Sequence, residues 1–269
     1  MELMHIGIVI PIYKSELSDK EKLSVSQAFK VLKKYKFFFV APRNLNSINY
    51  ERYFEPYHHQ FIRFDDKYFY QGLEGYNDLL LSEDFYKTFS EFKYILIYQP
   101  DAYVFRDELM KWCKEGYDYI GAPWLEDKDE KIKLNGVGNG GFSLRNIKKF
   151  LYIFSKCKIR TINDNSRIKH RFHKIQNQTI ALRSKLLNLI GNKKVVYYRK
   201  TKFNEDEFWG LIAPKISGRY KTAPAEEAVK FSFDGKSAPC RHPIPVQVGT
   251  LIRNMPAGDS GASRQVFVI

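Results

Sequence analysis

Two groups of acidic residues lie where a carboxylate could act on a ligand, and Asp101 is the first. It stands in Tyr98-Gln99-Pro100-Asp101-Ala102-Tyr103-Val104-Phe105, directly after the apolar run 93–98. A carboxylate that follows a buried strand of an α/β sheet lies at the edge where ligands bind. Mg²⁺ and Mn²⁺ favour such oxygen ligands, together with phosphate oxygens. An Asp that merely ends a strand at a turn would give the same pattern, and taken alone it is the commoner case.

The second group is Asn204-Glu205-Asp206-Glu207-Phe208-Trp209. Asp206, or Glu205 beside it, could remove the proton from an acceptor hydroxyl. The same stretch also reads as a helix start, with Asn204 as N-cap and acids that complement the helix dipole. In isolation the helix start is the stronger interpretation.

A glycine-rich stretch, Gly138-Asn139-Gly140-Gly141-Phe142-Ser143-Leu144-Arg145, precedes a short apolar strand. Glycines at such a place let the backbone approach a ligand closely, although a tight turn would need them as well. The spacing is neither Gly-x-Gly-x-x-Gly nor a Walker loop, so dinucleotide and P-loop sites are not indicated.

Strands and helices alternate through the first 150 residues and must position these groups. The run Ile6–Pro11 has the length and continuous apolar character of a strand buried on both faces, and the capping box Ser18-Asp19-Lys20-Glu21 begins a helix. Further strands are expected at about 37–40, 93–98, 117–121 and 142–144, and helices at about 75–89, 106–114 and from 147. This alternation predicts an α/β fold, with helices layered around a mostly parallel sheet.

Taken together, the motifs resemble the family labelled domain of unknown function 5672, over about residues 5–233. The resemblance rests on 75–82, 94–102, Trp112-Cys113, the Gly-Tyr-Asp-Tyr-Ile-Gly-Ala-Pro-Trp run 116–124, 139–145, and Glu205-Asp206-x-Phe208-Trp209. That family looks like a group of GT-A glycosyltransferases found with bacterial surface-polysaccharide genes. The resemblance therefore implies a GT-A-like three-layer sandwich.

The resemblance also implies an activity, in which a sugar passes from a nucleoside-diphosphate sugar to a glycan or lipid-linked acceptor. Asp206 would be the base of an inverting transfer, next to Glu205, and Asp101 would bind the diphosphate through Mn²⁺ or Mg²⁺. Donor-binding residues would be Pro11, Tyr13, Asn77, Gln99, Asp101, Asn139, Gly140 and Gly141, with Trp124 and Trp209 on the acceptor side. GT-A enzymes carry Asp-x-Asp where this chain has Gln99-x-Asp101. A catalytically inactive scaffold that binds a nucleotide sugar or a glycan is therefore the alternative.

The net charge of +14 is local. Residues 156–202 contain 14 Lys and Arg against one acid, Asp164, which is +13 of the total. Within this insertion, apolar residues spaced by three and four predict a basic amphipathic helix at about 167–190. Such a helix could pack on the domain with a solvated basic face, or dock on an anionic membrane that carries lipid-linked acceptors. Nucleic-acid binding is the weakest alternative, because no nucleic-acid motif surrounds the segment.

The composition changes after Phe233, so residues 1–233 are expected to form the glycosyltransferase domain. The segment 234–269 has one Lys and no Tyr or Trp, which predicts a poorly packed tail, fused or out of frame. The family usually closes on Leu-Pro-Phe-Gly-Cys-His, of which Cys240-Arg241-His242 is a faint echo. Three cysteines without ligand spacing, and no apolar run of membrane length, predict a cytoplasmic protein, with a peripheral place on the inner membrane face as an option.

Overall fold

The computed structural model of the protein describes residues 5–128, 131–162, 194–199, 204–234 and 266–268. Its strands are β1 (Ile6–Pro11), β2 (Lys36–Pro42), β3 (His59–Phe64), β4 (Tyr94–Tyr98), β5 (Ala102–Val104), β6 (Tyr119–Ile120), β7 (Pro123–Lys128), β8 (Lys131–Val137), β9 (Phe142–Asn146), β10 (Cys157–Ile162), β11 (Lys194–Arg199), β12 (Phe233–Asp234) and β13 (Val266–Val268). Its helices are α1 (Asp19–Val31), α2 (Ile48–Tyr53), α3 (Lys67–Tyr70), α4 (Gly72–Leu80), α5 (Glu83–Thr88), α6 (Leu109–Lys114), α7 (Ile147–Lys156), α9 (Glu205–Glu207), the π-helix η1 (Phe208–Ile212), α10 (Ala213–Ile216) and α11 (Ala225–Phe231).

The central sheet has six strands in the order β3-β2-β1-β4-β9-β6. Strands β3, β2, β1 and β4 pair in parallel, and β9 runs antiparallel between β4 and β6. The predicted α/β class with a mostly parallel sheet is confirmed. Among the described residues, three smaller sheets pair β7 with β8, β10 with β11, and β13 with both β12 and β5.

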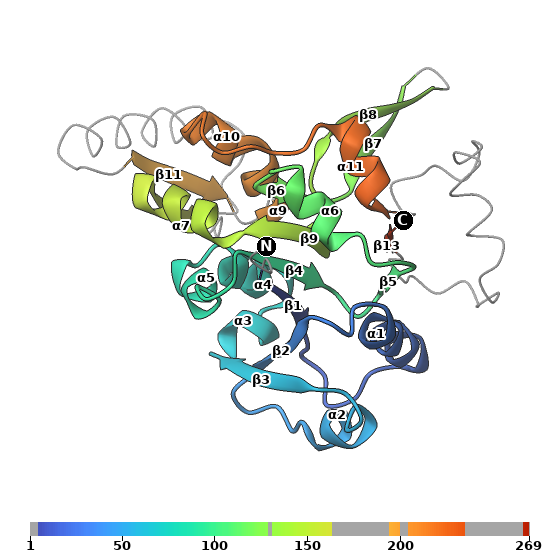
Figure 1. Ribbon diagram of the computed structural model, residues 1–269. Helices are drawn as coiled ribbons and strands as arrows, with labels where there is room; N and C mark the ends of the chain where they lie inside the picture. Colours follow the sequence, from blue (N-terminus) through green and yellow to red (C-terminus); the bar gives the residue numbers. More distant parts are fainter. Residues whose placement is uncertain (1–4, 129–130, 163–193, 200–203, 235–265, 269) are drawn as a thin grey trace.

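Helices cover both faces of the sheet, because successive side chains of a strand point in opposite directions. In β2, Phe37 and Phe39 face Phe29 of α1, with ring centroids 4.3 and 6.2 Å apart. Phe38 points to the opposite face and contacts Phe89 after α5 at 5.6 Å. In Figure 1, α1 accordingly lies on one side of the sheet and α5 and α7 lie on the other. The helix layers on the two faces of the sheet are therefore explained by the apolar side chains that its strands present on both faces.

Local sequence signals set the helix boundaries. The predicted capping box of α1 is present: the Ser18 N–H donates to Glu21 Oε2 at 2.8 Å, and the Glu21 N–H donates to Ser18 Oγ at 3.4 Å. The single helix predicted at 75–89 is wrong, since α4 ends at Leu80 and α5 begins at Glu83. Ser82 separates them because its hydroxyl accepts the Phe85 N–H and caps a new helix.

The described ends of the basic insertion are strands. Strands β10 and β11, which flank the predicted helix on its two sides in the sequence, pair in parallel. The predicted amphipathic helix at 167–190 lies mostly within 163–193, outside the described residues. In the predicted tail, β13 pairs with β5 and β12, while 235–265 also lie outside the described residues. The poor packing of that segment stays a prediction.

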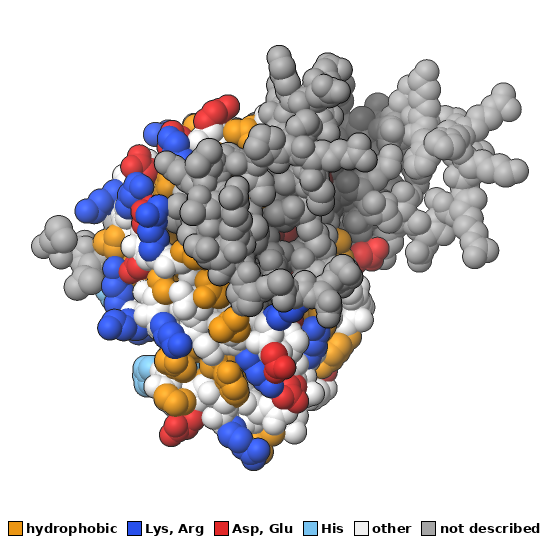
Figure 2. Space-filling view, turned by 90° about the vertical axis from the view of Figure 1, so that its right-hand side faces the viewer, with side chains coloured by type: hydrophobic (Ala, Val, Ile, Leu, Met, Phe, Trp, Pro, Cys, Tyr) orange, Lys and Arg blue, Asp and Glu red, His pale blue; other side chains and the backbone are white. Residues whose placement is uncertain are grey.

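The surface of the described part carries charges of both signs. On the face in Figure 2, Lys and Arg side chains occur together with acidic and hydrophobic ones. In the described part of the chain, no helix is long and apolar enough to cross a membrane.

The capping box supplies a test of the fold. We expect Ser18→Ala to lower the free energy of unfolding by about 1 kcal/mol, because the first turn of α1 loses a partner for its free N–H groups. The measurement is urea unfolding followed by circular dichroism. Ser155→Ala, at an exposed serine in the last turn of α7, is the control and should change stability by less than about 0.5 kcal/mol. Equal losses in the two variants would contradict the assigned start of α1.

Candidate active site

A pocket of about 370 Å³ opens beyond the carboxyl ends of β1 and β4. Pro11 and Tyr13 line it from the end of β1, and Gln99 and Asp101 line it from the segment after β4. The sheet continues to β2 and β3 on one side of this pair of strands and to β9 and β6 on the other. The pocket therefore lies at the topological switch point, where α/β sheets bind their ligands.

The charged side chains that line the pocket are Lys14, Glu21 and Asp101. Lys14 Nζ donates to Glu21 Oε1 at 3.3 Å, so these two side chains form an ion pair. The lining carries one cation against two carboxylates. An anionic ligand would meet a formal charge of −1 here, a balance that favours the entry of a cation together with the ligand.

The pocket is connected to the glycine-rich turn through Gln99. The Gln99 N–H donates to the Gly141 carbonyl at 2.7 Å. A Cβ at position 141 would overlap Oε1 of the Gln99 side chain. A side chain at position 141 would therefore force the end of the Gln99 side chain, which lines the pocket, to shift.

Other side chains enclose the rest of the turn in the same way. A Cβ on Gly138 would overlap the Trp124 ring, and one on Gly140 would overlap Glu205 Oε1. Asn139 adopts a left-handed conformation, with φ of +52°. The groups that closely approach these glycines are side chains of the protein, whereas the prediction concerned a ligand. Contact of Asn139, Gly140 and Gly141 with a donor stays a prediction.

Asp206 holds the turn from the other side. Its side chain is only 8% exposed, and Oδ2 accepts the Asn139 N–H at 2.8 Å. Oδ1 accepts the N–H of Glu207 at 2.9 Å. Burial raises the pKa of Asp206, while the N–H groups of Glu207, Asn139 and Gly140 counteract this rise. The carboxylate is thus held firmly, and its raised pKa brings it closer to the range of a general base.

Glu205 has a different environment. It is 3% exposed and lies against Arg145 of β9, which is fully buried. Two guanidinium nitrogens of Arg145 donate to Oε1 and Oε2 of Glu205 at 2.8 and 3.0 Å. Burial raises the pKa of Glu205, and the neighbouring guanidinium of Arg145 offsets part of this rise. A buried guanidinium in turn needs the carboxylate as its counter-ion. Both carboxylate oxygens are held by the ion pair, so the catalytic role expected of Glu205 is not supported.

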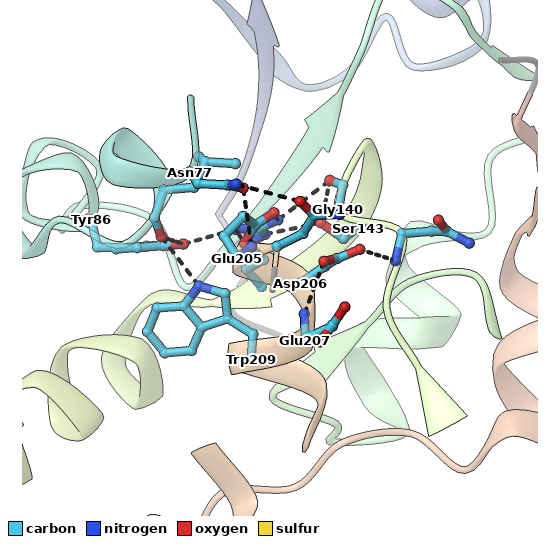
Figure 3. A network of polar contacts seen from close by, with 12 residues as sticks. Asn77, Tyr86, Gly140, Ser143, Glu205, Asp206, Glu207 and Trp209 are labelled. Carbon is cyan, nitrogen blue, oxygen red and sulfur yellow. Dashed lines mark hydrogen bonds and ion pairs between the residues drawn. The ribbon is translucent and has the colours of Figure 1, made fainter. Parts of the chain in front are cut away.

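Two further residues lie in the core instead of at the predicted ligand surface. Asn77 is 2% exposed, and its Oδ1 accepts the Glu205 N–H at 3.1 Å. Trp209 is fully buried, with Nε1 donating to the Leu80 carbonyl at 3.2 Å (Figure 3). Neither side chain lines the pocket. The donor contact expected of Asn77 and the acceptor contact expected of Trp209 are therefore not supported. The adjacent Tyr76 lines the pocket instead.

Trp124 is partly exposed and covers the turn. Its ring packs against Gly136 and Gly138, and Gly210 lies close to the ring edge. This contact fixes the start of the β7–β8 hairpin beside Asp206. The acceptor-side role of Trp124 stays a prediction.

A divalent cation would have Asp101 as its protein ligand in this pocket. In the part of the chain that the structure describes, no group of three His, Cys, Asp or Glu side chains is placed to hold a metal. One carboxylate together with diphosphate oxygens and water is nevertheless a usual set for Mg²⁺. The pocket thus fits a cation that arrives with a phosphorylated ligand.

Arg145 is the site residue that the sequence motifs did not single out. An Arg at the end of an apolar strand is unusual, because Arg is almost never fully buried unless it is paired. The sequence Phe142-Ser143-Leu144-Arg145 therefore indicated a buried and paired Arg, but it did not indicate which residue pairs with it.

The fold and the pocket define an α/β protein with a pocket at the switch point of its sheet. The chain belongs to the family described as "Protein of unknown function (DUF5672)", whose profile matches residues 58–245. The match extends beyond Phe233, where the resemblance in the sequence was expected to end. A search of curated proteins gave no match.

Among solved structures, a cytidylyltransferase from Leptospira borgpetersenii serovar Hardjo-bovis (strain JB197) is similar over 76% of this chain and 79% of that chain, with 9% identity and a TM-score of 0.35. The 4-diphosphocytidyl-2C-methyl-D-erythritol synthase from Anaerococcus prevotii DSM 20548 is similar over 84% of this chain and 93% of that chain, with 11% identity and a TM-score of 0.34. At these TM-scores neither similarity carries a functional inference.

The enclosed turn generates a prediction. We expect Gly140→Ala to lower the free energy of unfolding by about 1–3 kcal/mol, because the added methyl group overlaps the Glu205 carboxylate. Gly218→Ala is the matched control, since a Cβ there meets nothing within 4 Å, and it should be neutral or slightly stabilising. Urea unfolding of both variants is the measurement. A neutral Gly140→Ala would show that the turn and Glu205 are not in contact.

Proposed function

We propose that this protein is a GT-A-type glycosyltransferase, which transfers a sugar from a nucleoside-diphosphate sugar to a hydroxyl of a glycan or lipid-linked acceptor. The donor would occupy the switch-point pocket. Asp206 would take the proton of the acceptor hydroxyl, which corresponds to inversion at the sugar carbon.

The observation that supports this proposal best is the placement of two acids around one connected site. Asp101 lines the pocket, and Gln99 joins the pocket to the turn that Asp206 holds. A carboxylate for a cation-bound diphosphate and a carboxylate for a proton are the two acids that such a transfer requires. They come from segments more than 100 residues apart in the chain.

The donor end of the pocket suits a nucleotide. Pro11 and Tyr13 offer an apolar and aromatic surface at the end of β1, against which a nucleobase can stack. A diphosphate in a pocket with a lining charge of −1 needs added positive charge. A bound Mn²⁺ or Mg²⁺ would neutralise the leaving diphosphate, with Asp101 as its ligand from the protein.

Asp206 suits the role of the base. Its oxygens accept the backbone N–H groups of Asn139 and Glu207 among others, and a carboxylate has acceptor sites beyond these on both oxygens. The backbone contacts fix its orientation, so the proton acceptor is preorganised. Glu205 takes no part in the proton transfer in this proposal, because Arg145 holds both of its oxygens.

A scaffold that binds a nucleotide sugar without turnover is the second candidate. Two observations favour it: Gln99 stands where GT-A enzymes carry the first acid of Asp-x-Asp, and Asp206 is almost fully buried. Binding and turnover distinguish the two candidates, since the scaffold would bind the nucleotide and release no product.

The donor site is tested by ligand-induced stabilisation. We expect one of UDP, GDP and CDP, with Mn²⁺ and at 100 times its dissociation constant, to add about 2.7 kcal/mol of stability. That corresponds to a rise in Tm of very roughly 5–10 °C. The rise should depend on the metal and be lost in Asp101→Asn. Asp84→Asn, at an exposed Asp of α5 outside the pocket, should keep the rise.

Thermal unfolding with each nucleotide, with and without Mn²⁺, provides this measurement. No stabilisation by any of the three would contradict both the enzyme and the scaffold. A rise that Asp101→Asn retains would remove Asp101 from the site and leave nucleotide binding intact.

The base is tested by the pH dependence of turnover. Asp206 must be ionised to accept a proton, so kcat should fall as the pH is lowered through its pKa. Because burial raises that pKa, the fall should begin at a higher pH than an exposed Asp would give. The measurement is release of the nucleoside diphosphate from pH 4 to 8, with water as the acceptor of the sugar, where pH 4 is about the ordinary pKa of an Asp. Asp206→Asn should abolish turnover and keep nucleotide binding, whereas substantial turnover in this variant would exclude Asp206 as the base.

A further inference from the structure

Every hydrogen-bond donor of the buried Arg145 side chain has an acceptor. Nε donates to Ser143 Oγ at 2.9 Å, and one terminal nitrogen donates to Tyr86 Oη at 2.8 Å and Glu205 Oε2 at 3.0 Å. The other donates to Glu205 Oε1 at 2.8 Å and to the Gly140 carbonyl at 3.3 Å. A guanidinium has five N–H groups in one plane. All five are used, by groups from α5, the glycine-rich turn, β9 and α9.

These contacts fix the glycine-rich turn from two directions. Arg145 binds the carbonyl of Gly140, while Asp206 accepts the N–H of the preceding residue, Asn139. Glu205, which Arg145 holds at both oxygens, is the chain neighbour of Asp206. In Figure 3, Gly140 and Ser143 lie on one side of Glu205 and Tyr86 lies on the other, with Asp206 beside it. The position of Asp206 relative to the turn thus depends on the guanidinium.

Arg145 itself does not touch a ligand in the pocket. Its side chain is completely buried, and it is not among the residues that line the pocket. Arg145 is connected to the pocket through the glycine-rich turn. It binds the Gly140 carbonyl, and the carbonyl of the next residue, Gly141, accepts the N–H of the pocket residue Gln99. Any effect of Arg145 on the reaction must therefore act through the placement of Asp206 and of the turn next to Gln99.

We propose that Arg145 and Glu205 are positioning residues, which set the proton-accepting carboxylate of Asp206 against the donor pocket. This inference rests on the proposed function and adds to it two residues that support the base. The ion pair fixes the position of the groups that take part in the proton transfer, and neither Arg145 nor Glu205 takes part in the transfer itself.

Replacing Arg145 with lysine tests this positioning role. A lysine keeps the positive charge but has three donors and no planar fork, so it cannot bind both Glu205 oxygens and the other acceptors at once. The turn and Asp206 would lose their common support, while the pocket lining would remain. A misplacement of about 1 Å in a catalytic constellation can cost on the order of a hundredfold in rate.

The experiment compares full-length Arg145→Lys with wild type. The probes are UDP-glucose, GDP-mannose and CDP-glucose with Mn²⁺, and water serves as the acceptor of the sugar. The readouts are kcat and KM for nucleoside diphosphate release by this hydrolysis, and the dissociation constants of UDP, GDP and CDP. We expect kcat to fall by roughly ten- to a hundredfold. The nucleotide dissociation constant and the donor KM should stay within about threefold, because Arg145 makes no contact in the pocket.

Asp118→Asn is the control for a purely structural effect. Asp118 is 2% exposed and lies away from the glycine-rich turn. Its carboxylate accepts hydrogen bonds from the Lys221 N–H at 2.9 Å and from Asn146 Nδ2 at 3.0 Å. It should lose stability and keep the kcat of the wild type. If Arg145→Lys does not fold, Glu205→Gln is assayed in its place, with the same expected fall in kcat at unchanged nucleotide affinity.

The outcomes separate the inference from the proposed function. An unchanged kcat, a rise in KM alone, or an equal loss of kcat in Asp118→Asn would each overturn the positioning role while the transferase proposal stood. A wild type that releases no nucleoside diphosphate from any of the three donors would overturn the proposed transferase, and the positioning role with it, whether or not it binds a nucleotide.

Discussion

The structure around the site depends on the burial of one positive charge. Arg145 is fully buried, with the rings of Tyr119 and Phe150 within 6 Å of its guanidinium carbon. A cation in such surroundings needs a counter-ion and acceptors for all its N–H groups, and removing one partner of a buried pair typically costs about 3–5 kcal/mol. This requirement holds the end of β9, the helix α5, the glycine-rich turn and α9 in one arrangement.

The same requirement accounts for the composition of the turn. Gly140 lies against the carboxylate that neutralises Arg145, and Gly141 lies against Gln99 at the edge of the pocket. A Cβ at either position would overlap the side chain that it meets, so that side chain would have to move. The small residues are therefore explained by packing within the protein, before any ligand is considered. Asn139, which precedes Gly140, adopts the left-handed conformation, and its N–H donates to Asp206.

The order of the strands decides where the pocket lies. Strand β1 is followed by β2 and β3 on one side, and β4 lies on the other, so the segments that leave β1 and β4 diverge at their carboxyl ends. The pocket occupies the space between these segments, and Asp101 enters it because β4 ends three residues earlier, at Tyr98. Since β9 pairs with β4, the turn that precedes β9 comes to the same edge of the sheet. The segment that carries Asp101 and the turn that Asp206 holds lie at the same edge of the sheet for that reason.

The sequence by itself determined several of the elements and the pocket side of the site. Continuous apolar runs predicted β1 and β4, the capping box predicted the start of α1, and the position of Asp101 after a buried strand predicted its place at the ligand edge. These signals are local, because burial on both faces and helix capping leave their mark within a few residues.

Only the tertiary structure decided which polar residues face a ligand and which support the core. Asn77, Glu205 and Trp209 carried the same motif signal as Asp101, yet all three are buried and bonded to other parts of the protein. Arg145 carried little signal and has the most partners. The reason is physical: the acceptors of a buried donor come from segments far apart in the chain, and a sequence pattern records the need for a partner without recording which residue supplies it.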